Sequence, residues 1–183
     1  AVYSDSSEPI PINEDYSKLP ISPYGIAKLS SEHYCRLICD MNSIDCVILR
    51  YFNTYGPRQT LTPYVGVMTI FINKLINNQP PIIFGDGKQQ RDFVHVDDIV
   101  QGNILAMKTD IRSGTFNIGT GQGTSVNQIA EMLINRLLPK ISPQHTTSLK
   151  EETRNSIADI SQAKNILGFC PINAQLNPDD VIN

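Results

Sequence analysis

A tyrosine and a lysine stand four residues apart in the segment Ser22-Pro23-Tyr24-Gly25-Ile26-Ala27-Lys28. On a helix, side chains with this spacing lie on one face, one turn from each other. A nearby cation favours the ionised form of a phenol, and such a phenol can take a proton from an alcohol as hydride leaves its carbon. The same spacing also decorates many inert helix surfaces, so the pair predicts a catalytic site only in combination with other residues.

Two further polar residues could contact a ligand. Asn53 comes just after a run that ends at Tyr51, and doubly wound sheets bind ligands at the carboxyl ends of their strands. Arg91 follows a glycine-rich turn, and a planar guanidinium can hold a phosphate through two parallel hydrogen bonds. A loop-capping asparagine and a surface arginine are the plainer interpretations, which the sequence leaves open.

Alternating strands and helices must position these residues, a pattern typical of α/β folds. We expect residues 1–3 to be the tail of a strand, Asp97 to cap a helix, and the glycines of 119–123 to form a structural loop. A loop is predicted over 53–63, and another over 139–155 with at most one weak strand. Helices are predicted at about 22–42, 65–77, 97–108, 125–138 and 159–167, and strands at about 45–51, 80–84, 93–96 and 115–118.

The composition describes a single globular domain of 183 residues, 40% hydrophobic and 18% charged. A net charge of -3 argues against a nucleic-acid partner. The sequence contains no apolar run approaching the roughly 18 residues needed to cross a membrane. No secretion signal is visible, so we expect a cytoplasmic protein. No Cys or His spacing fits a metal site, and four buried free thiols are expected at Cys35, Cys39, Cys46 and Cys170.

Eight short motifs together resemble the extended short-chain dehydrogenase/reductase family, which includes NAD-dependent nucleotide-sugar epimerases and dehydratases. They follow the family's order and span roughly residues 1 to 170. The motifs are Ser22-Pro-Tyr-Gly-x-x-Lys28, Arg50-Tyr-Phe-Asn53, Tyr55-Gly-Pro-Arg58, Pro63-Tyr-x-Gly-Val67, Phe84-Gly-Asp-Gly87, Arg91-Asp-Phe-Val-His-Val-Asp-Asp98, Phe116-Asn-Ile-Gly-Thr-Gly121 and Ala158-Asp-Ile-Ser-x-Ala163.

The resemblance implies an α/β fold, namely the carboxyl-terminal part of a Rossmann-like, doubly wound parallel sheet with a smaller α/β substrate-binding domain. Residues 1–60 would be a remnant of the NAD-binding domain. Residues 61–183 would mainly bind the nucleotide sugar, with about 88–125 returning to the Rossmann core. The family's glycine-rich dinucleotide fingerprint and the Ser or Thr that partners the tyrosine are not found in this sequence. We therefore expect the chain to be an incomplete part of a longer enzyme.

The resemblance also assigns roles to residues. Tyr24 would be the catalytic acid/base, Lys28 would hold the nicotinamide ribose and assist the tyrosine, and Tyr51 would be a further contact for the cofactor, NAD. Asn53 and Arg91 would contact the substrate diphosphate.

Other substrate contacts are less regular. Phe84 would pack on the uracil ring, unless it is a plain core residue of a strand. Leu149 occupies the position of a second phosphate-binding arginine, so Lys150, one position on, becomes the candidate, whereas Arg154 is nearer the position of a different arginine. Ser156 matches a position in the sugar pocket where a small residue leaves room for an N-acetyl group.

These roles imply NAD-dependent epimerisation at C4 of a UDP-hexose, UDP-glucose or UDP-galactose with or without an N-acetyl group, through a 4-keto intermediate. Relatives often dimerise through the helix that carries the tyrosine, so we expect a homodimer. The family's dehydratases tend to have Ser-Asn-Asn-Tyr-Gly-Pro where this chain has Phe52-Asn-Thr-Tyr-Gly-Pro57, and this difference favours a UDP-sugar 4-epimerase.

Three alternatives to a 4-epimerase stay open. They are a UDP-glucuronate epimerase or decarboxylase, a sugar-nucleotide 4,6-dehydratase, and a non-catalytic fragment that binds nucleotide sugars and dimerises. His95 lies within a motif and is expected to be a packing histidine.

Overall fold

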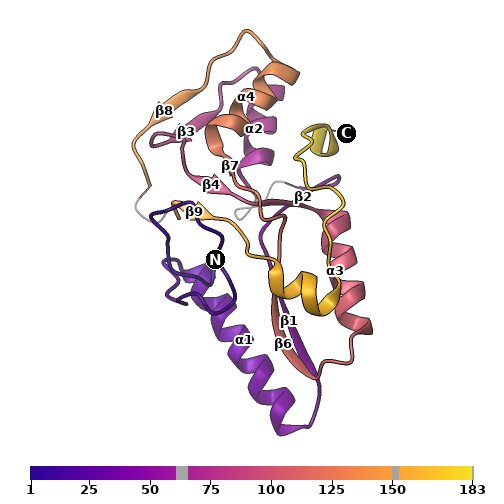
Figure 1. Cartoon of the computed structure of the whole chain (residues 1–183). Coiled ribbons are helices and arrows are strands. Elements are labelled where there is room, and N and C mark those ends of the chain that lie inside the picture. Colours follow the sequence, from indigo (N-terminus) through magenta and orange to yellow (C-terminus); the bar gives the residue numbers. More distant parts are fainter. Residues whose placement is uncertain (61–65, 150–152, 183) are drawn as a thin grey trace.

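The structure is a computed structural model that describes residues 1–60, 66–149 and 153–182 (Figure 1). Its long strands form a parallel pair, with β1 (Cys46–Tyr51) beside β6 (Ser113–Ile118) and Leu49 opposite Phe116. In Figure 1, helix α1 (Pro23–Met41) runs along one side of this pair and α3 (Val96–Lys108) along the other. This arrangement of parallel strands and helices confirms the predicted α/β fold.

The chain changes partner directly after β1. The amide of Phe52 still donates to the Ile118 carbonyl at 3.0 Å, but the amide of Asn53 donates to the Asp92 carbonyl at 2.9 Å. From there β2 (Asn53–Tyr55) pairs in parallel with β5 (Phe93–His95). The predicted 53–63 loop therefore begins with a strand, and Asn53 stands where two pairs of strands diverge. We call this point the sheet split.

A second group of elements lies in the upper part of Figure 1. Helix α2 (Val67–Ile76) packs against α4 (Val126–Leu137), and β3 (Ile82–Phe84) pairs with β8 (Gln144–Thr146), the weak strand allowed within 139–155. Strand β4 (Gln90–Arg91) lies between β7 (Thr124–Ser125) and β9 (Asn155–Ser156). The helix starts follow from local signals, because Ser22 caps α1 and Ser125 forms a capping box with Gln128 at α4.

Two main apolar cores hold these groups. The upper core joins α2, α4, Tyr55 and Phe93, with residues such as Phe71, Leu75, Ile129 and Leu133 at most 2% exposed. The lower core joins β5, β6 and α3 to the π-helical turn η1 (Ala163–Leu167) and Phe169. A short helix, α5 (Asp179–Ile182), lies near the end of the chain, and its Val181 and Ile182 pack on the upper core. The domain boundaries expected from the sequence stay a prediction.

Two local predictions are wrong. Helix α3 is capped by His95, not Asp97: the His95 Nδ1 accepts the Asp97 amide at 3.2 Å, and Asp97 lies in the first turn, where its charge suits the helix dipole. Residues 1–3 form no strand, because no described strand lies alongside to pair with their backbone.

The cysteines also differ from expectation. Cys35 and Cys170 are exposed, while Cys39 and Cys46 are half-buried, and all four are free thiols. Three of them lie on or beside α1, which buries only Gly25 among its residues, so the predicted burial of these thiols does not occur.

Candidate active site

A cleft of about 770 Å³ opens where α1 begins and where β1 and β2 meet at the sheet split. Its lining includes five of the eight residues predicted from the sequence, and they come from segments far apart along the chain. These five are Tyr24, Lys28, Tyr51, Asn53 and Ser156. Phe84 and Arg91 are not among the described residues of the lining, and Lys150 lies outside the described part of the chain.

The start of α1 presents the tyrosine and lysine to this cleft. The Ser22 hydroxyl accepts the Gly25 amide at 3.1 Å, and Pro23 occupies the first helical turn. One turn separates the two side chains, and the Lys28 Nζ lies 5.4 Å from the centre of the Tyr24 ring. Tyr24 keeps 46% of its surface exposed. The pair thus combines a reachable phenol with a cation, which suits proton exchange with an alcohol.

A third side chain on the same stripe, Glu32, attaches this helix to the strands. Both Glu32 oxygens accept hydrogen bonds from the buried Arg50, at 2.9 and 2.7 Å. Burial opposes the charge of Arg50, but the hydrogen bonds that its guanidinium donates to Glu32 and Tyr3 outweigh burial and raise the pKa of Arg50. The four-residue spacing from Lys28 to Glu32 was a signal for this role that the sequence analysis did not use.

Arg50 also reaches the amino-terminal segment. Its Nη1 donates to the Tyr3 hydroxyl at 2.8 Å, and that hydroxyl donates to the Asn117 side chain at 2.5 Å. Burial raises the pKa of Tyr3 to about 12. Tyr3, Arg50 and Asn117 are all less than a tenth exposed, so the wall behind Tyr24 and Lys28 is a closed polar network.

The predicted contacts at the sheet split differ in how they are held. The Asn53 side chain donates to the Asp92 carbonyl at 3.3 Å, which leaves it at the edge of the cleft. Tyr51 also lines the cleft, but its hydroxyl donates to the Asn103 side chain of α3 at 2.9 Å.

Asp92, which the sequence analysis did not single out, is fully buried. Its carboxylate accepts the amides of Thr120, Gly121 and Ala158 and the Thr120 hydroxyl, at 2.7 to 3.0 Å. Burial raises the pKa of this carboxyl even so. The loop over 119–123 therefore binds a side chain of its own fold, in agreement with its predicted structural role.

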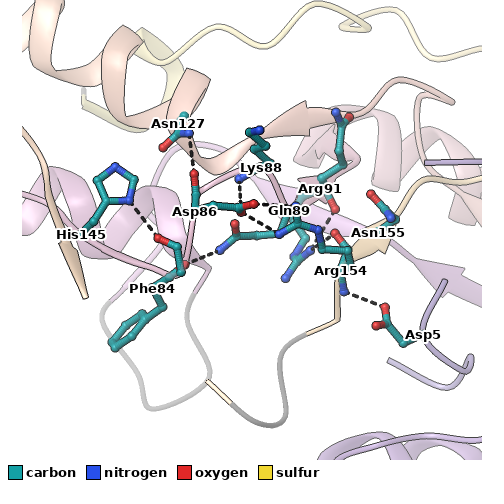
Figure 2. Close-up of polar contacts among 12 residues, drawn as sticks. Asp5, Phe84, Asp86, Lys88, Gln89, Arg91, Asn127, His145, Arg154 and Asn155 are labelled. Carbon is teal, nitrogen blue, oxygen red and sulfur yellow. Dashed lines mark hydrogen bonds and ion pairs between the residues drawn. The ribbon is translucent and has the colours of Figure 1, made fainter. Parts of the chain in front are cut away.

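Phe84 and Arg91 form a second group beside the cleft. Phe84 ends β3 and is 39% exposed, and Arg91 on β4 stands opposite Ser156 of β9 in the parallel register. The Arg91 Nη1 donates to the Gln90 carbonyl at 2.9 Å and to the Arg154 carbonyl at 3.5 Å. Figure 2 shows this group around the turn that follows Phe84. Ser156 connects it to the cleft.

The donor set of the cleft fits a polyhydroxylated ligand. Lys28 and Tyr24 can hydrogen-bond ribose or sugar hydroxyls, and the half-exposed Tyr51 offers an aromatic face. No group of three or more His, Cys, Asp or Glu side chains in the described ranges is arranged to hold a metal ion. None of the described helices is long and apolar enough to cross a membrane.

Comparison with solved structures finds the same fold in nucleotide-sugar enzymes. The UDP-glucose 4-epimerase of Thermotoga maritima, solved with UDP-glucose, is 40% identical with a TM-score of 0.86, over 94% of this chain and 55% of that one. The UDP-N-acetylglucosamine 4-epimerase of Methanobrevibacter ruminantium, in complex with UDP-N-acetylmuramic acid, is 32% identical with a TM-score of 0.87, over 98% and 57%. The UDP-glucuronic acid 4-epimerase of Bacillus cereus, in complex with UDP-glucuronic acid and NAD, is 34% identical with a TM-score of 0.81, over 98% and 55%.

The chain spans about half the length of the curated relatives it matches, from 43% to 51% of the first three. Residues 1–119 match the family model described as the NAD dependent epimerase/dehydratase family. This match and the similarity to solved epimerases confirm the resemblance carried by the eight motifs. The chain belongs to the NAD-dependent epimerase/dehydratase family.

Proposed function

We propose that this chain carries the acid/base and much of the substrate site of an NAD-dependent UDP-hexose 4-epimerase. The observation that carries the proposal is that Tyr24 and Lys28 share one cleft with Asn53 and Ser156, which come from two other parts of the chain. The complete activity would belong to a protein of the relatives' length. This chain lacks the glycine-rich dinucleotide fingerprint, so it would supply the proton path and sugar contacts rather than the main grip on NAD.

The proposed reaction uses Tyr24 as the proton carrier. When bound, NAD supplies reversible hydride exchange at C4 of the sugar. The Tyr24 phenolate would take the proton of the 4-hydroxyl and return it once the 4-keto sugar has turned its other face. The Lys28 ammonium, 5.4 Å from the centre of the Tyr24 ring, would bind the ribose hydroxyls. Asn53, at the sheet split, would hold the diphosphate so that the sugar stays within reach.

A small sugar-pocket residue favours a broad choice of hexose. Ser156 leaves room at the cleft, and the similar enzymes include one named for UDP-glucose and one for UDP-N-acetylglucosamine. We propose that both sugars are accepted. The similarity to a UDP-glucuronic acid 4-epimerase supports epimerisation of UDP-glucuronate as the second candidate function. Product analysis with UDP-glucose, UDP-N-acetylglucosamine and UDP-glucuronate separates these activities from a decarboxylase or a 4,6-dehydratase.

Calorimetry on the 183-residue chain tests the proposed division, in which this chain supplies the UDP contacts but not the main NAD contacts. We expect UDP to bind and NAD to bind weakly or not at all, because the uridine and diphosphate contacts come from this chain and the dinucleotide fingerprint does not. Tight binding of NAD would refute this division. If UDP binds and a protein of full length shows no epimerase activity, the chain is instead a binding and dimerising module.

We also propose that the protein is a homodimer and is located in the cytoplasm. Helix α1 exposes a run of large apolar side chains, including Tyr34, Leu37, Ile38 and Met41, which are 54% to 76% exposed. Exposed apolar faces of this kind often mark sites of protein–protein contact. We propose that α1 of a second copy supplies part of that cover.

A further inference from the structure

Arg154 lies just before β9 and pairs with the turn between β3 and β4. Its Nη1 and Nη2 donate to the two oxygens of Asp86, at 2.7 and 2.9 Å, in the parallel geometry that a guanidinium and a carboxylate favour (Figure 2). The guanidinium lowers the pKa of Asp86. Both side chains are close to half exposed, at 41% and 49%. An exposed pair of this kind adds little to the free energy of unfolding, so its geometry is the property of interest.

The backbone of Arg154 holds three further groups in place. Its amide donates to the Asp5 carboxylate at 2.6 Å. Its carbonyl accepts the Gln90 amide at 2.9 Å and the Arg91 Nη1 at 3.5 Å. Any shift of Arg154 therefore moves the carbonyl on which the Arg91 guanidinium rests, and it also moves Ser156, two residues along the same segment.

The turn that carries Asp86 is itself fixed. Gly85 and Gly87 both have a φ near +70°, and a Cβ on Gly87 would stand 1.9 Å from the Asn127 side chain of α4. The Asn127 side chain donates to the Asp86 carbonyl, and the Lys88 amide donates to the Asp86 carboxylate, both at 2.9 Å. Asp86 is thus a rigid anchor between Phe84 and Arg91, to which Arg154 is attached.

We infer that the Asp86–Arg154 ion pair positions the nucleotide-sugar site by fixing Arg91 and Ser156 relative to Phe84. The inference rests on the proposed function for the identity of the ligand, and Arg154 acts as a positioning residue rather than a ligand contact. The three residues that it aligns come from β3, β4 and β9 and are the predicted contacts for uracil, diphosphate and sugar. The pair joins the turn after β3 to the residue before β9, in addition to the backbone bonds that already join β4 to β9.

UDP binding measured by calorimetry on the 183-residue chain tests this role. Arg154→Met should weaken UDP binding about tenfold, the size expected when one charge-assisted hydrogen bond to the ligand is misaligned. Arg136→Met is the matched control, because it breaks an ion pair of the same 2.7 Å length, to Asp179, at an exposed site on α4. Both variants should have a free energy of unfolding in urea close to that of the unaltered chain. Unchanged UDP binding by Arg154→Met, or an equal loss in Arg136→Met, would overturn the inference.

Exchanging the two charges separates positioning from a general disturbance. Asp86→Arg alone should weaken UDP binding, and Asp86→Arg combined with Arg154→Asp should recover most of it, since the pair is re-formed in reverse. If the double variant binds UDP no more tightly than Asp86→Arg alone, the ion pair does not position the site. If the unaltered chain does not bind UDP, the proposed function fails first, and this inference fails with it.

Discussion

At the scale of single residues, the size of Ser156 offers a direct test of substrate choice. Ser156 lines the cleft on β9, beside Arg91 in the register. In a protein of full length, Ser156→Tyr should abolish turnover of UDP-N-acetylglucosamine but retain turnover of UDP-glucose, because the new ring would fill the space of the acetyl group. Ser156→Ala should keep both activities in a coupled assay of product sugars. An equal loss on both sugars in Ser156→Tyr contradicts the role.

The buried Tyr3 predicts that the stability of the fold depends on pH above pH 10. Its pKa is about 12 in the folded chain, compared with 10 for a free phenol, so the folded state keeps this proton to higher pH. The contribution of the protonated Tyr3 to the free energy of unfolding is complete below pH 10 and is lost as the pH rises to 12. The free energy of unfolding in urea should therefore fall by about 2 kcal/mol over that interval, at about 1.4 kcal/mol per pKa unit.

Removing the phenol identifies the source of this fall. Tyr3→Phe should be less stable at pH 9 and should lack this part of the decrease toward pH 12. Tyr34→Phe deletes a phenol that is 68% exposed on α1 and should follow the unaltered chain. A Tyr3→Phe curve that runs parallel to the unaltered one would rule out Tyr3 as the titrating group.

The candidate catalytic residues could be selected from the sequence, whereas most of the residues that support them could not. Tyr24 and Lys28 lie close in the chain, and their spacing is itself the signal. The Tyr3 hydroxyl, in contrast, bonds to Asn117, 114 residues away. The buried Asp92 reaches Ala158 across 66 residues. Such partners are set by the fold, and nothing in the local sequence marks them.

At the scale of elements, few side chains attach α1 to the rest of the molecule. Only Gly25 of its residues is buried, Leu29 packs on a small apolar cluster, and Arg36 donates to the Thr115 hydroxyl. The bidentate bond of Glu32 to the buried Arg50 is the ion pair among these attachments. Glu32→Gln should cost about 3 kcal/mol, because it leaves the buried guanidinium without its counter-charge. Hydrogen exchange should speed up along α1 and stay unchanged along α4.

Glu131→Gln is the matched control for this prediction. Glu131 is an exposed glutamate of α4, so the same chemical change there should alter neither the free energy of unfolding nor the exchange of α1. An equal change in the hydrogen-exchange rates of α1 and α4 after Glu32→Gln would contradict the role of the pair as an attachment of α1.

Elements with local signals were predictable, whereas several of the shortest strands were not. The helices at α1 and α4 begin where Ser22 and Ser125 predict, since a cap is a local hydrogen bond. Strands of two or three residues, such as β2, β4 and β9, show no periodicity of their own. They exist because another strand lies beside them, which a single sequence does not reveal.

At the scale of the whole molecule, the exposed apolar faces of α1 and α3 predict self-association. Besides the α1 residues, α3 exposes Val100, Ile104 and Met107 at 45% to 85%. We expect the 183-residue chain to associate with rising concentration in sedimentation velocity. Leu37→Lys, on the α1 face, should shift the distribution toward the monomer. Ile172→Lys changes an isolated side chain that is 79% exposed and should leave the distribution unaltered.

The sheet split has a mechanical consequence for the molecule. Between Phe52 and Asn53 the chain passes from the β1–β6 pair, which borders the lower core, to the β2–β5 pair, which contributes Tyr55 and Phe93 to the upper core. A ligand seated there would touch both halves and act as a bridge across the joint. Substrate binding would then stabilise both cores at once, because a ligand that contacts both is released when either unfolds.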